Sequence, residues 1–121
     1  MPAATQVATE YLDAFCSGDF DRARTLVSED FEFVGPLTQV RGRDAFFDGA
    51  APLHPFLRGR RVLRDIGDGD ELCSIYELAL ETPTATGSVL LADWVTTADG
   101  VVVAERLVYD TAAFLALMPK G

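Results

Sequence analysis

The sequence predicts an α+β protein in which a curved antiparallel sheet carries helices on its concave face, with a cone-shaped pocket between the two layers. Helical patterns dominate the first 50 residues, whereas four long strand patterns follow one another between residues 58 and 110. The last two strands meet at Asp99-Gly100, a dipeptide that strongly favours a β-hairpin. Helices and strands that are segregated in this way are typical of an antiparallel sheet covered on one side. Small ligands usually bind between such layers.

Four segments have helical patterns. In residues 4–16, apolar side chains recur at helical spacing and form one face. Gly18 suits the left-handed position after a helix end, and the side chain of Asp19 can cap a second helix over 20–28. A third helix is predicted over 43–50, where the prolines that follow end it and place His54 in a loop. Residues 111–118 are expected to form a short C-terminal helix or tail.

Alternating apolar and polar residues predict the strands, and clusters of Gly, Pro and Asp separate them. A short strand and a second short extended piece come first, and two long strands and the final hairpin follow. The expected ranges are 31–34, 37–41, 58–66, 71–81, 87–97 and 101–110.

Glu105 is the residue of this pattern that most suggests chemistry. It is the one carboxylate within the strand Val101–Tyr109, and it shares a strand face with Leu107 and Tyr109 because strand side chains alternate. If that face is buried, desolvation raises the pKa of the Glu105 carboxyl. Such a carboxyl can transfer protons near neutral pH.

The chain length of 121 residues indicates one domain, 1–121. Its net charge of −9 argues against nucleic acid and anionic membranes as partners. No apolar run reaches the roughly 20 residues that span a bilayer, and the N-terminus lacks a secretory pattern. Cys16 and Cys73 are interpreted as buried free thiols of a cytoplasmic protein. No metal-ligand spacing, phosphate loop or nucleotide motif is present, so we expect neither metal nor cofactor.

Several short motifs, in their order and spacing, resemble a known superfamily. It is the cone-shaped, cystatin-like α+β superfamily of nuclear transport factor 2, the SnoaL-like polyketide cyclases, ketosteroid isomerase and limonene epoxide hydrolase. The motifs are Tyr11-Leu12-Asp13-Ala14-Phe15 with Gly18-Asp19, Phe31, Gly42-Arg43, and Asp99-Gly100 followed by Arg106-Leu107-Val108-Tyr109-Asp110.

The resemblance also implies which side chains face the inside of the cone. Asp93, Glu77 and Glu81 are expected outside, and a β-bulge would exchange the two faces of a strand. The residues expected inside are Val103, Glu105, Leu107 and Tyr109 on the last strand, Leu90, Ala92 and Trp94 on its partner, and Ser74, Tyr76, Leu78 and Leu80 on the strand before.

The functional residues of the relatives carry over only in part. Tyr11 matches the tyrosine that holds the oxyanion in ketosteroid isomerase, whereas the positions of its two acids fall on Ala92 and Gly35. One acid position of limonene epoxide hydrolase falls on Leu107, and no Arg-x-Asp precedes Trp94. The cyclases of this family use an acid in the cone, and Glu105 could fill such a role.

The leading hypothesis is a cofactor-free SnoaL-like enzyme that acts by acid/base proton transfer on a small, largely apolar or aromatic substrate. Cyclisation, isomerisation, dehydration and epoxide opening all fit this description. Glu105 is the predicted acid/base, and Tyr11 or Tyr76 holds a substrate oxygen. The predicted substrate-binding residues are Trp94, Tyr109, Phe33, Leu90, Leu107 and His54.

Other interpretations stay open at this point. The chain could be a non-catalytic binding or interaction domain, or a structural domain whose cone is filled by its own side chains. Glu105 could be paired with an arginine of the group Arg58, Arg60, Arg61 and Arg64, which could otherwise bind an anion or balance local charge. If the register of its strand is off by one residue, Asp93 faces inward and partners Glu105.

A homodimer is expected to form through the outer face of the sheet. Val102, Ala104 and Val108 are assigned to that face by strand alternation, and a row of apolar side chains there needs to be covered.

Overall fold

The computed structural model describes residues 4–119, so the first three and last two residues of the expected domain, 1–121, lie outside it. The helices and strands follow one another in the order that the sequence predicts. Their bounds are α1 Ala4–Cys16, α2 Phe20–Thr25, β1 Val27–Val34, β2 Gln39–Arg41, α3 Arg43–Ala50, the 3-10 helix η1 Ala51–Phe56, β3 Leu57–Asp68, β4 Glu71–Glu81, β5 Thr86–Ala98, β6 Val101–Tyr109 and α4 Thr111–Leu117.

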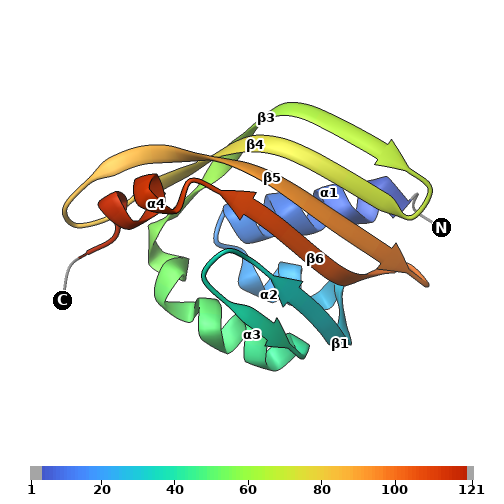
Figure 1. Cartoon of the computed structure of the whole chain (residues 1–121). Helices are drawn as coiled ribbons and strands as arrows, with labels where there is room; N and C mark the ends of the chain where they lie inside the picture. Colours follow the sequence, from blue (N-terminus) through green and yellow to red (C-terminus); the bar gives the residue numbers. More distant parts are fainter. Residues whose placement is uncertain (1–3, 120–121) are drawn as a thin grey trace.

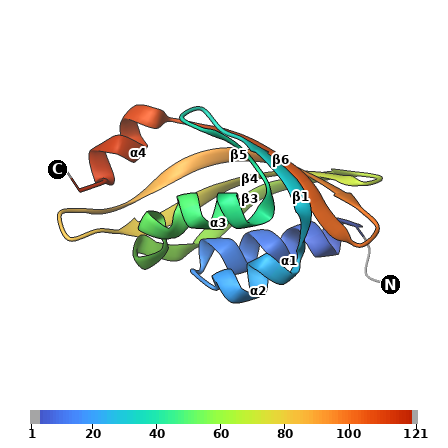
Figure 2. The same cartoon turned by 90° about the horizontal axis from the view of Figure 1, so that it is seen from below.

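The six strands form one curved sheet in the order β2-β1-β6-β5-β4-β3. Helices α1, α2 and α3 lie across its concave side, and α4 lies at one end (Figures 1 and 2). The strand pairs are antiparallel except for β1 and β6, which run parallel. This arrangement confirms the predicted α+β class and adds one parallel pair that the sequence pattern did not predict.

The second helix ends earlier than predicted, and the strand after it begins earlier. α2 ends at Thr25 rather than at residue 28, and β1 begins at Val27 rather than at residue 31. The reason is the sheet: the Leu26 carbonyl accepts a hydrogen bond from the Val102 amide of β6, with an N–O distance of 2.8 Å. The chain therefore joins β6 at a point where its apolar spacing would also have suited a helix.

The concave face of the sheet packs on α1 and on a cluster of phenylalanines. Tyr11 and Leu12 of α1 are fully buried, as is Phe31 of β1. The ring of Phe46, from α3, lies 5.0 Å from that of Phe31 and 5.6 Å from that of Phe15. These contacts hold α1 and α3 at fixed positions below the sheet, so the space that remains beside them has a defined shape.

A β-bulge in the final hairpin makes the predicted register of β5 wrong. From the turn, Ala98 pairs with Val101 and Thr97 with Val102, but Thr96 pairs with Ala104, so Val103 is an extra residue. Without the bulge Trp94 would lie opposite Glu105. With it, Val95 takes that position, and the odd-numbered residues of β5 point inward.

The consequence is an exchange of faces along β5. Asp93 is fully buried on the concave side, whereas Trp94 and Leu90, predicted to face the cone, are 45% and 55% exposed on the outer face. Val102, predicted on the outer face, is fully buried instead. The inward residues predicted for β4, Ser74, Tyr76, Leu78 and Leu80, are all buried as expected.

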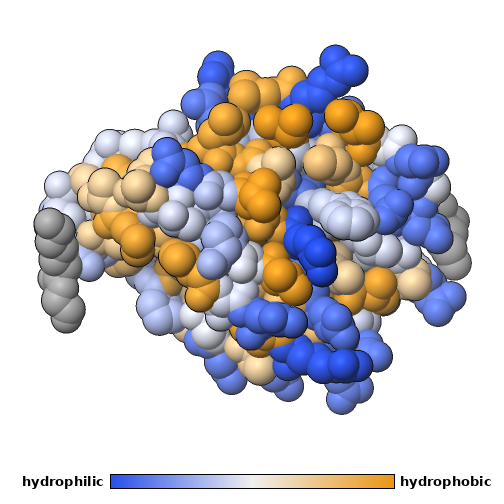
Figure 3. Space-filling model, viewed as in Figure 1, coloured by the Kyte–Doolittle hydropathy of each residue, from blue (hydrophilic) through white to orange (hydrophobic). Residues whose placement is uncertain are grey.

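The outer face of the sheet carries several exposed apolar side chains. Leu90, Trp94 and Val108 are the clearest, and Figure 3 shows apolar side chains gathered over the sheet between charged ones. Cys73, expected to be buried, is only partly so on this face, and both cysteines are free thiols. Within residues 4–119, no helix has the length and apolar character required to cross a bilayer.

Candidate functional site

A large apolar cavity lies between the concave face of the sheet and the helices. Its volume is about 640 Å³, which is enough for a small organic molecule. Its wall is built mainly from aromatic and aliphatic side chains of β1, α3, η1, β4, β5 and β6, among them Phe33, Phe46, Leu53, Phe56, Leu91 and Leu107. The cavity also excludes the interpretation of a cone filled by its own side chains.

Few polar groups reach this cavity. Glu105 is the one carboxyl among the described lining residues, and none of these residues is a Lys or an Arg. Tyr76 and Cys16 lie near Glu105 in the wall, where the Cys16 thiol is 3.8 Å from the Tyr76 hydroxyl. An apolar wall with one acid suits a neutral substrate, because none of the described lining residues offers a positive charge to an anionic ligand.

A hydrogen bond from helix α1 positions the Glu105 side chain. Its carboxyl is buried, and the Tyr11 hydroxyl donates a hydrogen bond to Glu105 Oε1 at 2.5 Å. Tyr11 does not line the cavity. It therefore orients the carboxyl from the protein side, rather than contacting a bound molecule as the sequence suggested.

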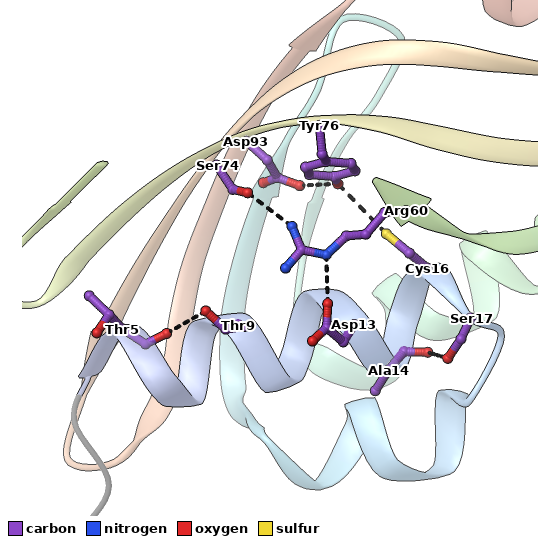
Figure 4. Close-up of polar contacts among 10 residues, drawn as sticks. All are labelled: Thr5, Thr9, Asp13, Ala14, Cys16, Ser17, Arg60, Ser74, Tyr76 and Asp93. Carbon is purple, nitrogen blue, oxygen red and sulfur yellow. Dashed lines mark hydrogen bonds and ion pairs between the residues drawn. The ribbon is translucent and has the colours of Figure 1, made fainter. Parts of the chain in front are cut away.

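Asp93 is the second acid of the site. It lies on β5, directly opposite Ser74 of β4, and the Tyr76 hydroxyl donates a hydrogen bond to Asp93 Oδ2 at 2.7 Å (Figure 4). Leu107 is its partner on β6, so Asp93 and Glu105 are diagonal neighbours on the same face. Each of the two carboxyls changes the pKa of the other.

Burial and proximity raise the pKa values of both acids. Desolvation raises the pKa of Glu105 well above its ordinary value of 4.5, and the nearby Asp93 carboxylate raises it further. Desolvation also raises the pKa of Asp93, while the neighbouring Glu105 carboxyl, the hydrogen bond from Tyr76 and the charge of Arg60 oppose that rise. The environment therefore favours the proton on Glu105 and the negative charge on Asp93.

The other polar groups of the site stay neutral. Burial raises the pKa values of the Tyr11 and Tyr76 hydroxyls well above 10. Burial also raises the pKa of the Cys16 thiol to about 12, so this thiol is not a nucleophile near neutral pH. The groups able to exchange a proton in this range are the two carboxyls.

The structure brings the three residues predicted as catalytic, Glu105, Tyr11 and Tyr76, close together: Tyr11 donates a hydrogen bond to Glu105, and Tyr76 donates one to its neighbour Asp93. Of the predicted binding residues, Phe33, Leu107 and Tyr109 line the cavity. Trp94 and Leu90 do not, because the bulge at Val103 turns them outward.

His54 also lies outside the cavity wall. It sits in η1, where Ala51–Phe56 form a 3-10 helix rather than the expected loop. Its Nε2 is 2.7 Å from the Gly18 carbonyl oxygen, and its ring packs on Phe20 at 4.8 Å between centroids. The His54 side chain therefore connects η1 with the turn between α1 and α2.

Two residues of the site were not among the predicted site residues. Asp93 was an alternative that depended on the register, and Arg60 was one of four arginines with no distinguishing pattern. Only the structure shows why Arg60 turns inward. Gly59, just before it, has a φ of +100° and lies at a bulge of β3. Arg58 pairs instead with Glu81, and Arg61 with Glu77, so neither pairs with Glu105.

Comparison with known proteins identifies related sequences and folds. The model of the SnoaL-like domain family matches residues 8–105. No curated protein sequence matches this chain. Among solved structures, a protein from Kribbella flavida DSM 17836 has a TM-score of 0.82 and 27% identity, with 95% of this chain and 93% of that one covered.

Two further structures share the fold at lower identity. An LEH-like epoxide hydrolase from M. tuberculosis has a TM-score of 0.81 and 17% identity, covering 94% of this chain and 88% of that one. A protein from Jannaschia sp. CCS1, assigned as a SnoaL-like polyketide cyclase, has a TM-score of 0.79 and 18% identity. The match covers 97% of this chain and 93% of that one.

Proposed function

Because the chain belongs to the SnoaL-like domain family, we propose that it is an acid/base enzyme that transfers protons on a small, neutral, largely apolar substrate. The observation that carries the proposal is the placement of Glu105. It is the one carboxyl among the described lining residues of an apolar cavity, and a second buried carboxyl, Asp93, is its diagonal neighbour on the same face of the sheet. Two coupled acids in different environments are a recurrent arrangement for proton transfer at neutral pH.

In this proposal the carboxyl pair holds one proton. Glu105 delivers that proton to a substrate oxygen, and the carboxylate that results can then take a proton from a substrate carbon or a water molecule. Tyr11 keeps the Glu105 carboxyl oriented, and Tyr76 lies beside it in the wall, where its hydroxyl donates to Asp93. Epoxide opening, cyclisation, isomerisation and dehydration all need a proton to be given or taken at such a position. The similar folds of an epoxide hydrolase and a cyclase fit this range of reactions.

Filling the cavity tests whether turnover takes place there. Leu107 lines the cavity on the same strand face as Glu105, and the larger indole of a Leu107→Trp variant would occupy the space where a substrate binds. We expect this variant to lose conversion of neutral apolar epoxides and cyclic ketones that the wild-type protein converts. Product formation, followed by mass spectrometry in ¹⁸O-labelled or deuterated water, measures the loss.

The matched control is Leu115→Trp, because Leu115 lies on α4, is 53% exposed and does not line the cavity. This variant should retain conversion. Undiminished turnover by Leu107→Trp would place the reaction elsewhere on the molecule. If the wild-type protein binds these molecules in the cavity but converts none of them, the non-catalytic binding function is favoured instead.

We also propose that two copies of the chain associate through the outer face of the sheet. The support is the exposed apolar set Leu90, Trp94 and Val108, which a second copy would cover. We expect Val108→Glu to convert a dimer into a monomer in sedimentation equilibrium. A wild-type monomer at every concentration tested would rule this association out.

A further inference from the structure

Arg60 is a buried cation close to the carboxyl pair. Although it lies on β3, at the edge of the sheet, its side chain is only 2% exposed. Its guanidinium lies over the ring of Tyr76, with Cζ 4.9 Å from the ring centroid. Its Nη1 donates to Ser74 Oγ at 2.9 Å, and its Nε donates to Asp13 Oδ1 at 2.8 Å (Figure 4).

These contacts place the cation asymmetrically with respect to the two acids. Ser74 pairs directly with Asp93 in the sheet, and Tyr76 donates a hydrogen bond to Asp93. Arg60 therefore contacts the two residues that flank Asp93, and its charge lowers the pKa of Asp93. Glu105 lies on β6, one strand further from Arg60, and the charge of Arg60 is not among the main causes of its pKa shift.

An ion pair with Asp13 alone accounts poorly for this burial. Asp13 is 61% exposed, so it compensates the cation only from the solvent side. Among the described residues, Arg60 Nη2 is buried without a hydrogen-bond partner, and so is Asp93 Oδ1. Removing a cation from water is unfavourable unless a buried countercharge offsets the loss of hydration. An ionised Asp93 supplies that countercharge.

We propose that Arg60 is a positioning residue that keeps the negative charge on Asp93 and thereby leaves the proton on Glu105, the acid that faces the cavity. The inference rests on the proposed function for its purpose, since it makes Glu105 a proton donor in the resting protein. The titratable and charged groups around the pair are Tyr11, Asp13 and Cys16 from α1, Arg60 from β3 and Tyr76 from β4.

The test is a titration of the side-chain carboxyls by ¹³C NMR, on the whole chain and without substrate. In the wild-type protein, Asp93 should ionise first and Glu105 last. Arg60→Met keeps an unbranched apolar side chain against Tyr76 but removes the charge. We expect the Asp93 midpoint to rise by about 1–3 pH units, the usual effect of a close opposite charge, and the Glu105 signal to move in the first ionisation step.

Two control variants separate charge from packing. Arg60→Lys retains a cation and should keep Asp93 ionising first. Asp13→Asn removes the solvent-side partner but keeps the buried guanidinium, so it should leave the Asp93 midpoint within a few tenths of a pH unit.

An unchanged Asp93 midpoint in a folded Arg60→Met protein would overturn the proposal. If Arg60→Met does not fold, the order of ionisation in the wild-type protein decides: a Glu105 that ionises before Asp93 contradicts the proposal. None of these results depends on turnover, so the proposal for Arg60 and the proposed enzymatic function can be disproved independently of each other.

Discussion

Replacement of Glu105 by glutamine is expected to lower kcat by about 10²–10⁴-fold, the usual contribution of a general acid or base, while the protein stays folded. Glutamine has nearly the shape of a protonated glutamic acid. Its amide oxygen can accept the hydrogen bond that the Tyr11 hydroxyl now gives to Glu105 Oε1. This hydrogen bond therefore survives, whereas the carboxyl proton that can be transferred is lost.

The matched control is Glu77→Gln. Glu77 lies on β4 on the outer face, where it pairs with Arg61, and it does not line the large cavity. The control variant should turn over substrate at the wild-type rate. Wild-type kcat in a folded Glu105→Gln protein would show that Glu105 does not transfer the proton. Binding without turnover in both wild-type and variant protein would favour a non-catalytic role.

The same substitution is expected to change how stability depends on pH. The pKa of Glu105 is raised on folding, so the folded protein binds this proton more tightly than the unfolded chain does. Linkage then makes the free energy of unfolding fall as pH rises above the unfolded value near 4.5, and the fall continues until the folded pKa is passed. A single proton contributes a slope of about 1.4 kcal/mol per pH unit within that window.

Glutamine removes this proton without removing the hydrogen bond from Tyr11, so Glu105→Gln should gain stability relative to the wild-type protein as pH rises from 4.5 towards 8. Urea unfolding of both proteins across this range measures the difference. The surface carboxylates are present in both proteins, and their contribution cancels in the comparison. Parallel stability curves would mean that Glu105 ionises in the folded protein as readily as in the unfolded chain.

Much of this fold can be read from the sequence, because most of its elements carry a clear period. In β4, Ser74, Tyr76, Leu78 and Leu80 occupy alternate positions on the face that the family resemblance implies is inside, and all four are buried. α1 begins and ends at the predicted residues. The local sequence pattern is sufficient to predict an element and its buried face where one face is apolar and the other is polar.

The register of β5 could not be read in this way. The hairpin returns through Val101, Val102 and Val103, three identical residues that contain no alternation. A bulge at Val103 is therefore invisible in the sequence, yet it exchanges every side chain of β5 between the two faces. This is why Asp93 joins Glu105 inside and Trp94 lies outside.

The inward position of Arg60 on β3 could not be predicted from the sequence either. Four arginines occur between residues 58 and 64, and their spacing fits either face of a strand. Which of them turns inward depends on the bulge near Gly59 and on partners from distant parts of the chain, Asp13 and Ser74. The sequence predicts that a carboxyl faces a pocket, whereas its environment is assembled by long-range contacts.

The most direct test of the account is the pKa of the Glu105 carboxyl in the folded wild-type protein, measured from its ¹³C chemical shift as the pH is varied. The account predicts a midpoint well above 4.5, with Asp93 ionising at lower pH than Glu105. A Glu105 midpoint at or below 4.5 would contradict it, because the cavity would then hold an ordinary carboxylate with no proton to donate near neutral pH.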